Sequence, residues 1–119
     1  MQKTRDLEVR LINFASDCID VSEGLPNTYA GFHLRAQLVR SATSPALHYG
    51  EAQAAESPND FIHKMKVCLK ELRETYNCLR LIRKKCWLEE GNLNISVNEN
   101  NELISIFVTS LKTAQKNRK

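Results

Sequence analysis

The chain has 119 residues, of which 42% are hydrophobic, 26% charged and 7% aromatic. This composition fits one compact water-soluble domain better than a disordered tail or a membrane protein. A domain of this length buries roughly 65% of its unfolded surface and folds without a disulfide or a metal. Gly and Pro together number only seven, which nearly excludes a β-sandwich or barrel with its frequent turns. We therefore expect a single all-α domain over residues 1–119.

Positive charge is concentrated in the second half of the chain. Residues 1–60 carry five basic and eight acidic side chains, whereas residues 61–119 carry twelve basic and six acidic ones. The formal net charge of +3 thus conceals a basic C-terminal half. Such an asymmetry can form a basic face for an anionic partner.

The first predicted helix runs from Asp6 to about Glu23, because apolar residues recur there at the three- and four-residue spacing of an amphipathic helix. They are Leu7, Leu11, Phe14, Cys18 and Val21, with Ile12, Ala15 and Ile19 widening the stripe. Gly24 and Pro26 end this helix.

The second predicted helix runs from Tyr29 or Gly31 to Ala55. Its interior contains Pro45, which removes one backbone hydrogen bond and is expected to bend or interrupt the helix. The residues of its apolar face are Leu34, Leu38, Ala42, Tyr49 and Ala52.

The third predicted helix has the clearest start signal, with Ser57 as N-cap, Pro58 at the first helical position and Asp60 at the third. Its core seam alternates steps of four and three residues. The seam residues are Phe61, Met65, Cys68, Leu72, Thr75, Leu79, Ile82 and Cys86.

Gly91 and the Asn-rich stretch 92–101 are predicted to break the helical pattern, so that the fourth helix begins at Glu99 or Asn101. The fourth helix ends in the basic segment 116–119, where positively charged side chains interact favourably with the C-terminal end of the helix dipole. Four amphipathic helices with short connections fold most simply as an antiparallel up-down four-helix bundle. The apolar residues of the fourth helix are Leu103, Ile104, Phe107, Val108, Leu111 and Ala114.

The cysteines and the N-terminus predict a cytoplasmic protein. The four cysteines have no C-x-x-C spacing and fall in or beside apolar helical patterns, as expected of reduced core thiols. The polar N-terminal residues do not form a signal peptide, and no apolar run reaches the length of a membrane span. The cysteines are Cys18, Cys68, Cys78 and Cys86.

Two segments of the sequence resemble a known family. They are Arg40-Ser41-Ala42-Thr43-Ser44 with the following His48-Tyr49-Gly50-Glu51-Ala52, and residues 60–66 with 70–75 of the next helix. Over essentially its whole length the chain resembles the bacterial four-helix-bundle proteins encoded by intervening sequences in the 23S ribosomal RNA gene. It departs from the family pattern at Pro45, where an Ile-like core residue is usual, and at His48, where Asn is usual.

The resemblance implies a small four-helix subunit that assembles into a ring-like homopentamer, has no established enzymatic activity and is connected with nucleic acid. A related bundle is the accessory protein of diversity-generating retroelements, in which a basic pentamer works with a reverse transcriptase on RNA. The comparison with this accessory protein rests on analogy of fold and charge.

A basic row on the third helix is the strongest candidate site. Steps of four and three residues keep its side chains on one stripe about 27 Å long, along which a phosphate backbone can bind in a salt-dependent way. The alternative is a solvated helix surface in which Glu71 and Glu74 pair with the row or with its neighbours. The row consists of Lys66, Lys70, Arg73, Arg80 and Lys84, with Asn77 between them.

A polar cluster on the second helix comprises Arg40, Ser44, His48 and Glu51, at steps of four, four and three. His48 and Glu51 could act as an acid–base pair, but the sequence supplies neither a nucleophile nor an oxyanion site. We favour a structural polar cluster or a subunit contact, joined by Arg73 or Glu74.

We expect neither a metal nor another cofactor. The three histidines lie fifteen residues apart, no Glu-x-x-His ligand pair occurs, and the glycines do not form a phosphate-binding loop. Trp87 could stack on a base, although we expect it to close the core or an interface. The sequence therefore predicts a non-catalytic homo-oligomer that binds RNA or DNA, or alternatively a scaffold whose ring recruits a protein partner.

Overall fold

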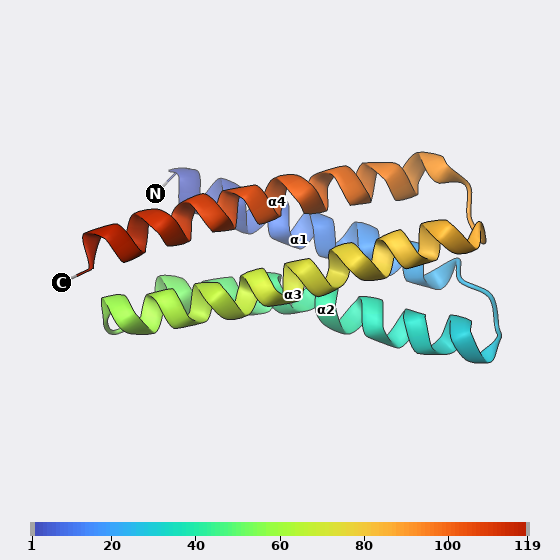
Figure 1. Ribbon diagram of the computed structural model, residues 1–119, viewed down its shortest axis with the longest axis horizontal. Helices are drawn as coiled ribbons and strands as arrows, with labels where there is room; N and C mark the ends of the chain where they lie inside the picture. Colours follow the sequence, from blue (N-terminus) through green and yellow to red (C-terminus); the bar gives the residue numbers. More distant parts are fainter. Residues whose placement is uncertain (1, 119) are drawn as a thin grey trace.

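The computed structural model describes residues 2–118, with side chains from residue 6 onward. It consists of α1 (Gln2–Glu23), α2 (Tyr29–Gln53), α3 (Pro58–Lys85) and α4 (Glu90–Asn117), and these described residues form no strand. Successive helices run in opposite directions, so that both ends of the chain lie at the same end of the elongated molecule (Figure 1). The predicted all-α, antiparallel up-down four-helix architecture is confirmed.

Each helix packs against two others: α1 and α3 both contact α2 and α4. The predicted seams of α1, α2 and α3 supply most of the core, in which Phe14, Leu38 and Leu72 are at most 1% exposed. From α4, the ring of Phe107 meets that of Tyr49 edge to face, with centroids 6.0 Å apart. One continuous apolar core thus joins all four helices.

Side-chain caps fix the starts of α2 and α3. Thr28 Oγ1 accepts the N–H of Gly31 at 3.0 Å, and Ser57 Oγ accepts the N–H of Asp60 at 3.1 Å. These bonds satisfy N–H groups that have no partner within the helix. The predicted N-cap at Ser57 is confirmed.

Pro45 lies inside the continuous helix α2 and is buried, so it does not split the helix. A proline within a helix removes one i→i−4 bond. The carbonyl of Pro45 itself faces α3, where it accepts the Sγ–H of Cys68 at 4.0 Å. Pro45 therefore lies in the packed interface between α2 and α3.

The prediction of a break at residues 92–101 is wrong, because α4 begins at Glu90 and includes this whole stretch. Asparagine is a weak helix former, but burial of an apolar seam outweighs that propensity. Leu93, Val97 and Asn100 continue the four–three spacing of Ile104 and Phe107 and are all buried.

Two side chains predicted in the core are exposed. Cys86 is the C-cap of α3 in the left-handed conformation, with φ 58°, and its thiol is exposed because the chain leaves the helix there. Ile12 is 52% exposed, since the buried stripe of α1 is narrower than predicted. Trp87, as expected, packs against the core.

Among the described helices, none combines the length and the apolar character needed to cross a lipid bilayer.

Candidate nucleic-acid interface

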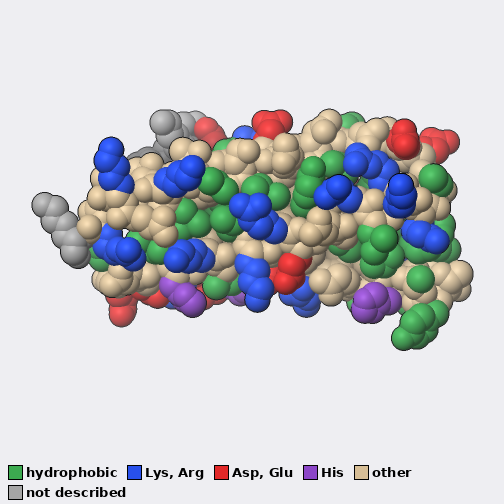
Figure 2. All heavy atoms as spheres, in the orientation of Figure 1, with side chains coloured by type: hydrophobic (Ala, Val, Ile, Leu, Met, Phe, Trp, Pro, Cys, Tyr) green, Lys and Arg blue, Asp and Glu red, His purple; other side chains and the backbone are tan. Residues whose placement is uncertain are grey.

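The side chains of the basic row, Lys66, Lys70, Arg73, Arg80 and Lys84, are all exposed along α3. Because α3 is unbroken from Pro58 to Lys85, the row follows a single helix for about 27 Å. Figure 2 shows Lys and Arg side chains spread over the face formed by α3 and α4, with acidic side chains mainly at its margins. The predicted stripe is therefore present as a basic surface.

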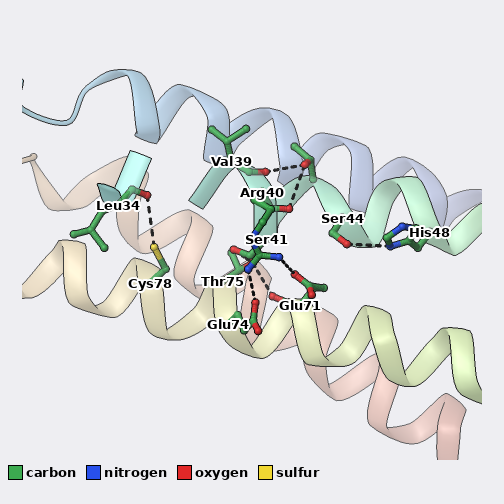
Figure 3. Close-up of polar contacts among 11 residues, drawn as sticks. Leu34, Val39, Arg40, Ser41, Ser44, His48, Glu71, Glu74, Thr75 and Cys78 are labelled. Carbon is green, nitrogen blue, oxygen red and sulfur yellow. Dashed lines mark hydrogen bonds and ion pairs between the residues drawn. The ribbon is translucent and has the colours of Figure 1, made fainter. Parts of the chain in front are cut away.

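Glu71 and Glu74, the acidic neighbours of the row, are bound by α2. Arg40 Nη1 donates to Glu71 Oε2 at 2.8 Å, and Arg40 Nη2 donates to Glu74 Oε2 at 2.7 Å (Figure 3). These hydrogen bonds, first to Glu74 and then to Glu71, raise the pKa of Arg40 above its ordinary value. Both carboxylates are thereby directed to the α2 side of α3.

The row itself takes no part in the ion pairs of the described chain. Arg80 instead lies over the ring of Tyr76, 5.4 Å from its centroid, and its Nη1 donates to Asn77 Oδ1 at 3.5 Å. A cation held by neutral groups keeps its full charge for an anionic ligand. The row is thus free of ion pairs among the described residues, although Glu74 lines the same surface hollow as Lys66, Lys70 and Arg73.

The predicted polar cluster on α2 divides into two parts. Arg40 binds the acids of α3, whereas Ser44 Oγ lies 3.0 Å from His48 Nδ1. His48 Nε2 lies 3.9 Å from a carboxylate oxygen of Glu51. Of the two predicted links to α3, the structure forms the one through Glu74.

Ser44, His48 and Glu51 follow the order of a serine–histidine–carboxylate triad, but their setting differs from that of a catalytic site. All three lie within α2 and past its first turn, where backbone N–H groups bond within the helix and cannot stabilise an oxyanion. The side chains of His48 and Glu51 are 44% and 59% exposed. Exposure to solvent also weakens the electrostatics on which such a triad depends.

Three cysteines are confined to the core. Burial raises the pKa of Cys18 strongly and raises the pKa values of Cys68 and Cys78 to about 11, because a low-polarity interior disfavours the thiolate. Thiolates, imidazoles and carboxylates are the groups that hold zinc. Among the described residues, no three His, Cys, Asp or Glu side chains come together as ligands.

A cleft of about 510 Å³ lies between α1 and α4, a feature that the sequence did not predict. Beyond it, Arg10 Nε and Nη2 donate to the two oxygens of Glu99, at 2.9 and 2.6 Å, and this hydrogen bonding raises the pKa of Arg10. The acids of α4 at positions 99 and 102 therefore face α1. The cleft is lined by Asp17, Asp20, Val21, Gly24, Leu88, Glu89, Asn92, Leu93, Ile95 and Ser96.

The opposite flank of α4 carries amides that sequence reasoning missed. Arg83 Nη1 of α3 donates to Asn94 Oδ1 at 3.2 Å, so this flank adjoins α3. Asn98 and Asn101 follow at steps of four and three and are exposed. The sequence signal that could have revealed this flank was the apolar seam through Leu93 and Val97, which makes residues 92–101 helical.

Of the predicted basic segment at the chain end, Lys116 and Arg118 are exposed, whereas Lys119 lies outside the described residues. Arg118 Nη1 donates to Asn59 Oδ1 at 3.3 Å. This bond joins the end of α4 to the start of α3, at the same end of the bundle as Lys66.

Comparison with known proteins found a matching family model and a similar crystal structure. A family model described as 23S rRNA-intervening sequence protein matches residues 5–109. A crystal structure of a protein of unknown function from the S23 ribosomal protein family of Bacteroides thetaiotaomicron is 26% identical in sequence. It superposes with a TM-score of 0.83 over 92% of this chain and 98% of that one. No curated protein matches the chain.

Proposed function

This chain belongs to the 23S rRNA-intervening sequence protein family, and we propose its function from the surface of the bundle, since the similar crystal structure is of a protein of unknown function. The protein is a non-catalytic, homo-oligomeric, cytoplasmic protein that binds nucleic acid through the basic row of α3. One observation carries this proposal: Arg40 forms ion pairs with Glu71 and Glu74, and the row itself forms none among the described residues.

Binding through the row has a distinctive salt dependence. Each phosphate that a lysine or arginine neutralises releases counterions, so the logarithm of affinity falls with the logarithm of salt by about 0.7 to 0.9 per contact. Five contacts predict a loss of affinity on the order of a hundredfold or more between about 50 and about 200 mM salt. Fluorescence anisotropy with a labelled RNA hairpin measures this slope.

Two lysines of α3 provide a matched pair of variants. Lys70→Gln removes a charge from the row and is expected to reduce the slope by about 0.9. Lys64→Gln removes a charge whose Nζ lies 3.3 Å from Asp60 Oδ1 and is expected to leave affinity unchanged. A salt-independent affinity, or equal effects of the two variants, would contradict the proposal.

Oligomerisation is supported by apolar side chains that the single bundle leaves exposed. Leu47 is 71% exposed and Ile95 61%, while Val9 and Ile12, three residues apart on α1, are about half exposed. Exposed apolar side chains that lie together are typical of subunit interfaces, and of these four Val9 and Ile12 share one face of α1. A homopentamer would repeat the basic row around a ring and strengthen weak single-site binding through multivalency.

Light scattering coupled to size exclusion measures the assembly directly. A pentamer has five times the mass of 13.6 kDa of one chain, and Ile12→Glu is expected to lower the mass if α1 lies in the interface. A monomeric mass for the unmodified protein would reject the ring.

The same exposed apolar residues support a second candidate function, a scaffold whose ring recruits a protein partner. This function predicts a partner that stays bound after nuclease treatment and that Lys70→Gln does not release. Binding lost with nuclease would favour the nucleic-acid function instead.

A further inference from the structure

The asparagines of α4 lower the intrinsic helix propensity of the segment in which they lie. Residues 92–101 contain five asparagines, and asparagine is less favourable in a helix than alanine by up to about 0.7 kcal/mol per residue. Two of the five have a structural role, because Asn94 accepts from Arg83 and Asn100 donates to the Leu72 carbonyl. Asn98 and Asn101 are exposed and form none of the hydrogen bonds of the described chain.

Asn98 and Asn101 lie on the α3 flank of α4. They follow Asn94, which contacts Arg83 of α3, at steps of four and three residues that keep all three on one stripe. Glu99 and Glu102 lie on the other flank, where both contact Arg10 of α1. We call Asn94, Asn98 and Asn101 the amide stripe.

The amide stripe runs beside the basic row. On α3, Arg80 precedes Arg83 by three residues and Arg73 precedes Arg80 by seven, so all three arginines share the flank that faces α4. Packed helices lie about 8–10 Å apart. A nucleic-acid strand bound along the basic row therefore has the neutral amides of the amide stripe along one edge.

Neutral amides and cations suit different parts of a nucleic acid. Lysine and arginine neutralise phosphate, whereas an amide both donates and accepts hydrogen bonds and so matches a hydroxyl. The ribose 2′-hydroxyl, itself a donor and an acceptor, distinguishes RNA from DNA. We infer that Asn98 and Asn101 bind ribose 2′-hydroxyls of an RNA whose phosphates lie along the basic row; this rests on the nucleic-acid function proposed above.

The test compares an RNA hairpin with a DNA hairpin of the same sequence, each labelled for fluorescence anisotropy. The double variant Asn98→Ala/Asn101→Ala is expected to raise the Kd for RNA roughly 5- to 30-fold, as for two lost hydrogen bonds. Because amides release no counterions, the salt slope stays the same. The Kd for DNA is unchanged, so the preference for RNA disappears.

Asn92→Ala provides the matched control. It removes an exposed amide of α4 that lines the cleft toward α1 and is expected to leave both Kd values unchanged. Circular dichroism confirms that each variant is as helical as the unmodified protein.

The outcomes separate the two proposals. If the unmodified protein binds neither hairpin, both proposals are wrong. If it binds with a steep salt slope but the double variant leaves the RNA Kd unchanged, or weakens RNA and DNA equally, the nucleic-acid function stands and the role of the amide stripe is overturned.

Discussion

Arg40 of α2 and Glu71 of α3 form an ion pair between a half-exposed guanidinium and a nearly buried carboxylate, with 2.8 Å between Nη1 and Oε2. The side chain of Glu71 is 11% exposed, against 52% for Arg40. The carboxylate of Glu71 is therefore more shielded from water than the guanidinium of Arg40, and it relies on Arg40 for a charged hydrogen-bond donor. The ion pair links α2 to α3 and orients the carboxylate of Glu71 toward the α2 side of α3.

Removing Arg40 should therefore destabilise the bundle. Arg40→Ala is expected to lower the free energy of unfolding by about 2 kcal/mol, because a mostly buried carboxylate loses its charged donor. Urea denaturation measures this change. The double variant Arg40→Ala/Glu71→Gln should be more stable than Arg40→Ala, and Arg73→Ala on the exposed row should change stability by less than about 0.5 kcal/mol. Equal losses for Arg40→Ala and Arg73→Ala would show that the pair contributes nothing.

Two glycines of α2 should respond to alanine in opposite directions. A Cβ at Gly31 would lie 1.9 Å from the carbonyl oxygen of Pro26, so Gly31→Ala is expected to cost about 2 kcal/mol or more through displacement of the backbone. A Cβ at Gly50 meets nothing within 4 Å, and Gly50→Ala should stabilise the helix by about 0.5–1 kcal/mol. Thermal unfolding followed by circular dichroism gives both signs, and a stabilised Gly31→Ala would refute the close approach.

One thiol in four should react readily with a disulfide reagent. Cys86 is exposed, whereas Cys18, Cys68 and Cys78 are buried and burial raises their pKa values, which suppresses the reactive thiolate. Absorbance after addition of an aromatic disulfide should show one fast equivalent in the native protein and four in denaturant. Cys86→Ser should abolish the fast phase. Two or more fast equivalents in the native protein would contradict the burial of the core thiols.

Stability should fall in alkaline solution as the core thiols ionise on unfolding. The pKa values of Cys68 and Cys78 are raised from 9.0 to about 11 in the folded state. Their contribution is therefore complete below about pH 9 and is lost as the pH rises through about 11, by up to about 1.4 kcal/mol per pH unit for each thiol. Urea denaturation with reductant from neutral pH to about pH 10.5 measures this slope.

Cys78→Ala is the control for the alkaline effect. Its stability should fall less steeply with pH than that of the unmodified protein, because one titrating thiol is missing, while the tyrosines and lysines contribute equally to both. Identical slopes would show that the thiol of Cys78 ionises as freely in the folded as in the unfolded state.

Periodicity predicted the helices wherever the seam was apolar. The Phe14 stripe of α1 and the Leu72 stripe of α3 are buried as expected, and the cap at Ser57 is where the sequence placed it. The prediction failed at Asn100, a buried polar residue that occupies a seam position and hides the continuity from Leu93 to Ile104. It failed also at Cys86, where a repeat of four and three residues does not indicate where the chain turns away.

The candidate site was predictable only in part. The spacing of Lys66, Lys70 and Arg73 placed the basic row on one face of α3. The spacing did not show that the row lacks acidic partners, because that depends on the reach of Arg40 across from α2. Contacts between helices are set by their rotation and alignment, which one sequence stretch does not specify.

The buried amide of Asn100 bears on that alignment. Its Nδ2 donates to the Leu72 carbonyl at 3.1 Å, while its Oδ1 has no partner within the described chain. A displacement of α4 along α3 that broke this bond and left the buried donor unpaired would cost about 1–3 kcal/mol. Sliding is thus penalised although the apolar residues of the seam could re-pack. Asn100 therefore fixes the longitudinal position of α4 along α3, and with it the position of Asn98 and Asn101 relative to the arginines of α3.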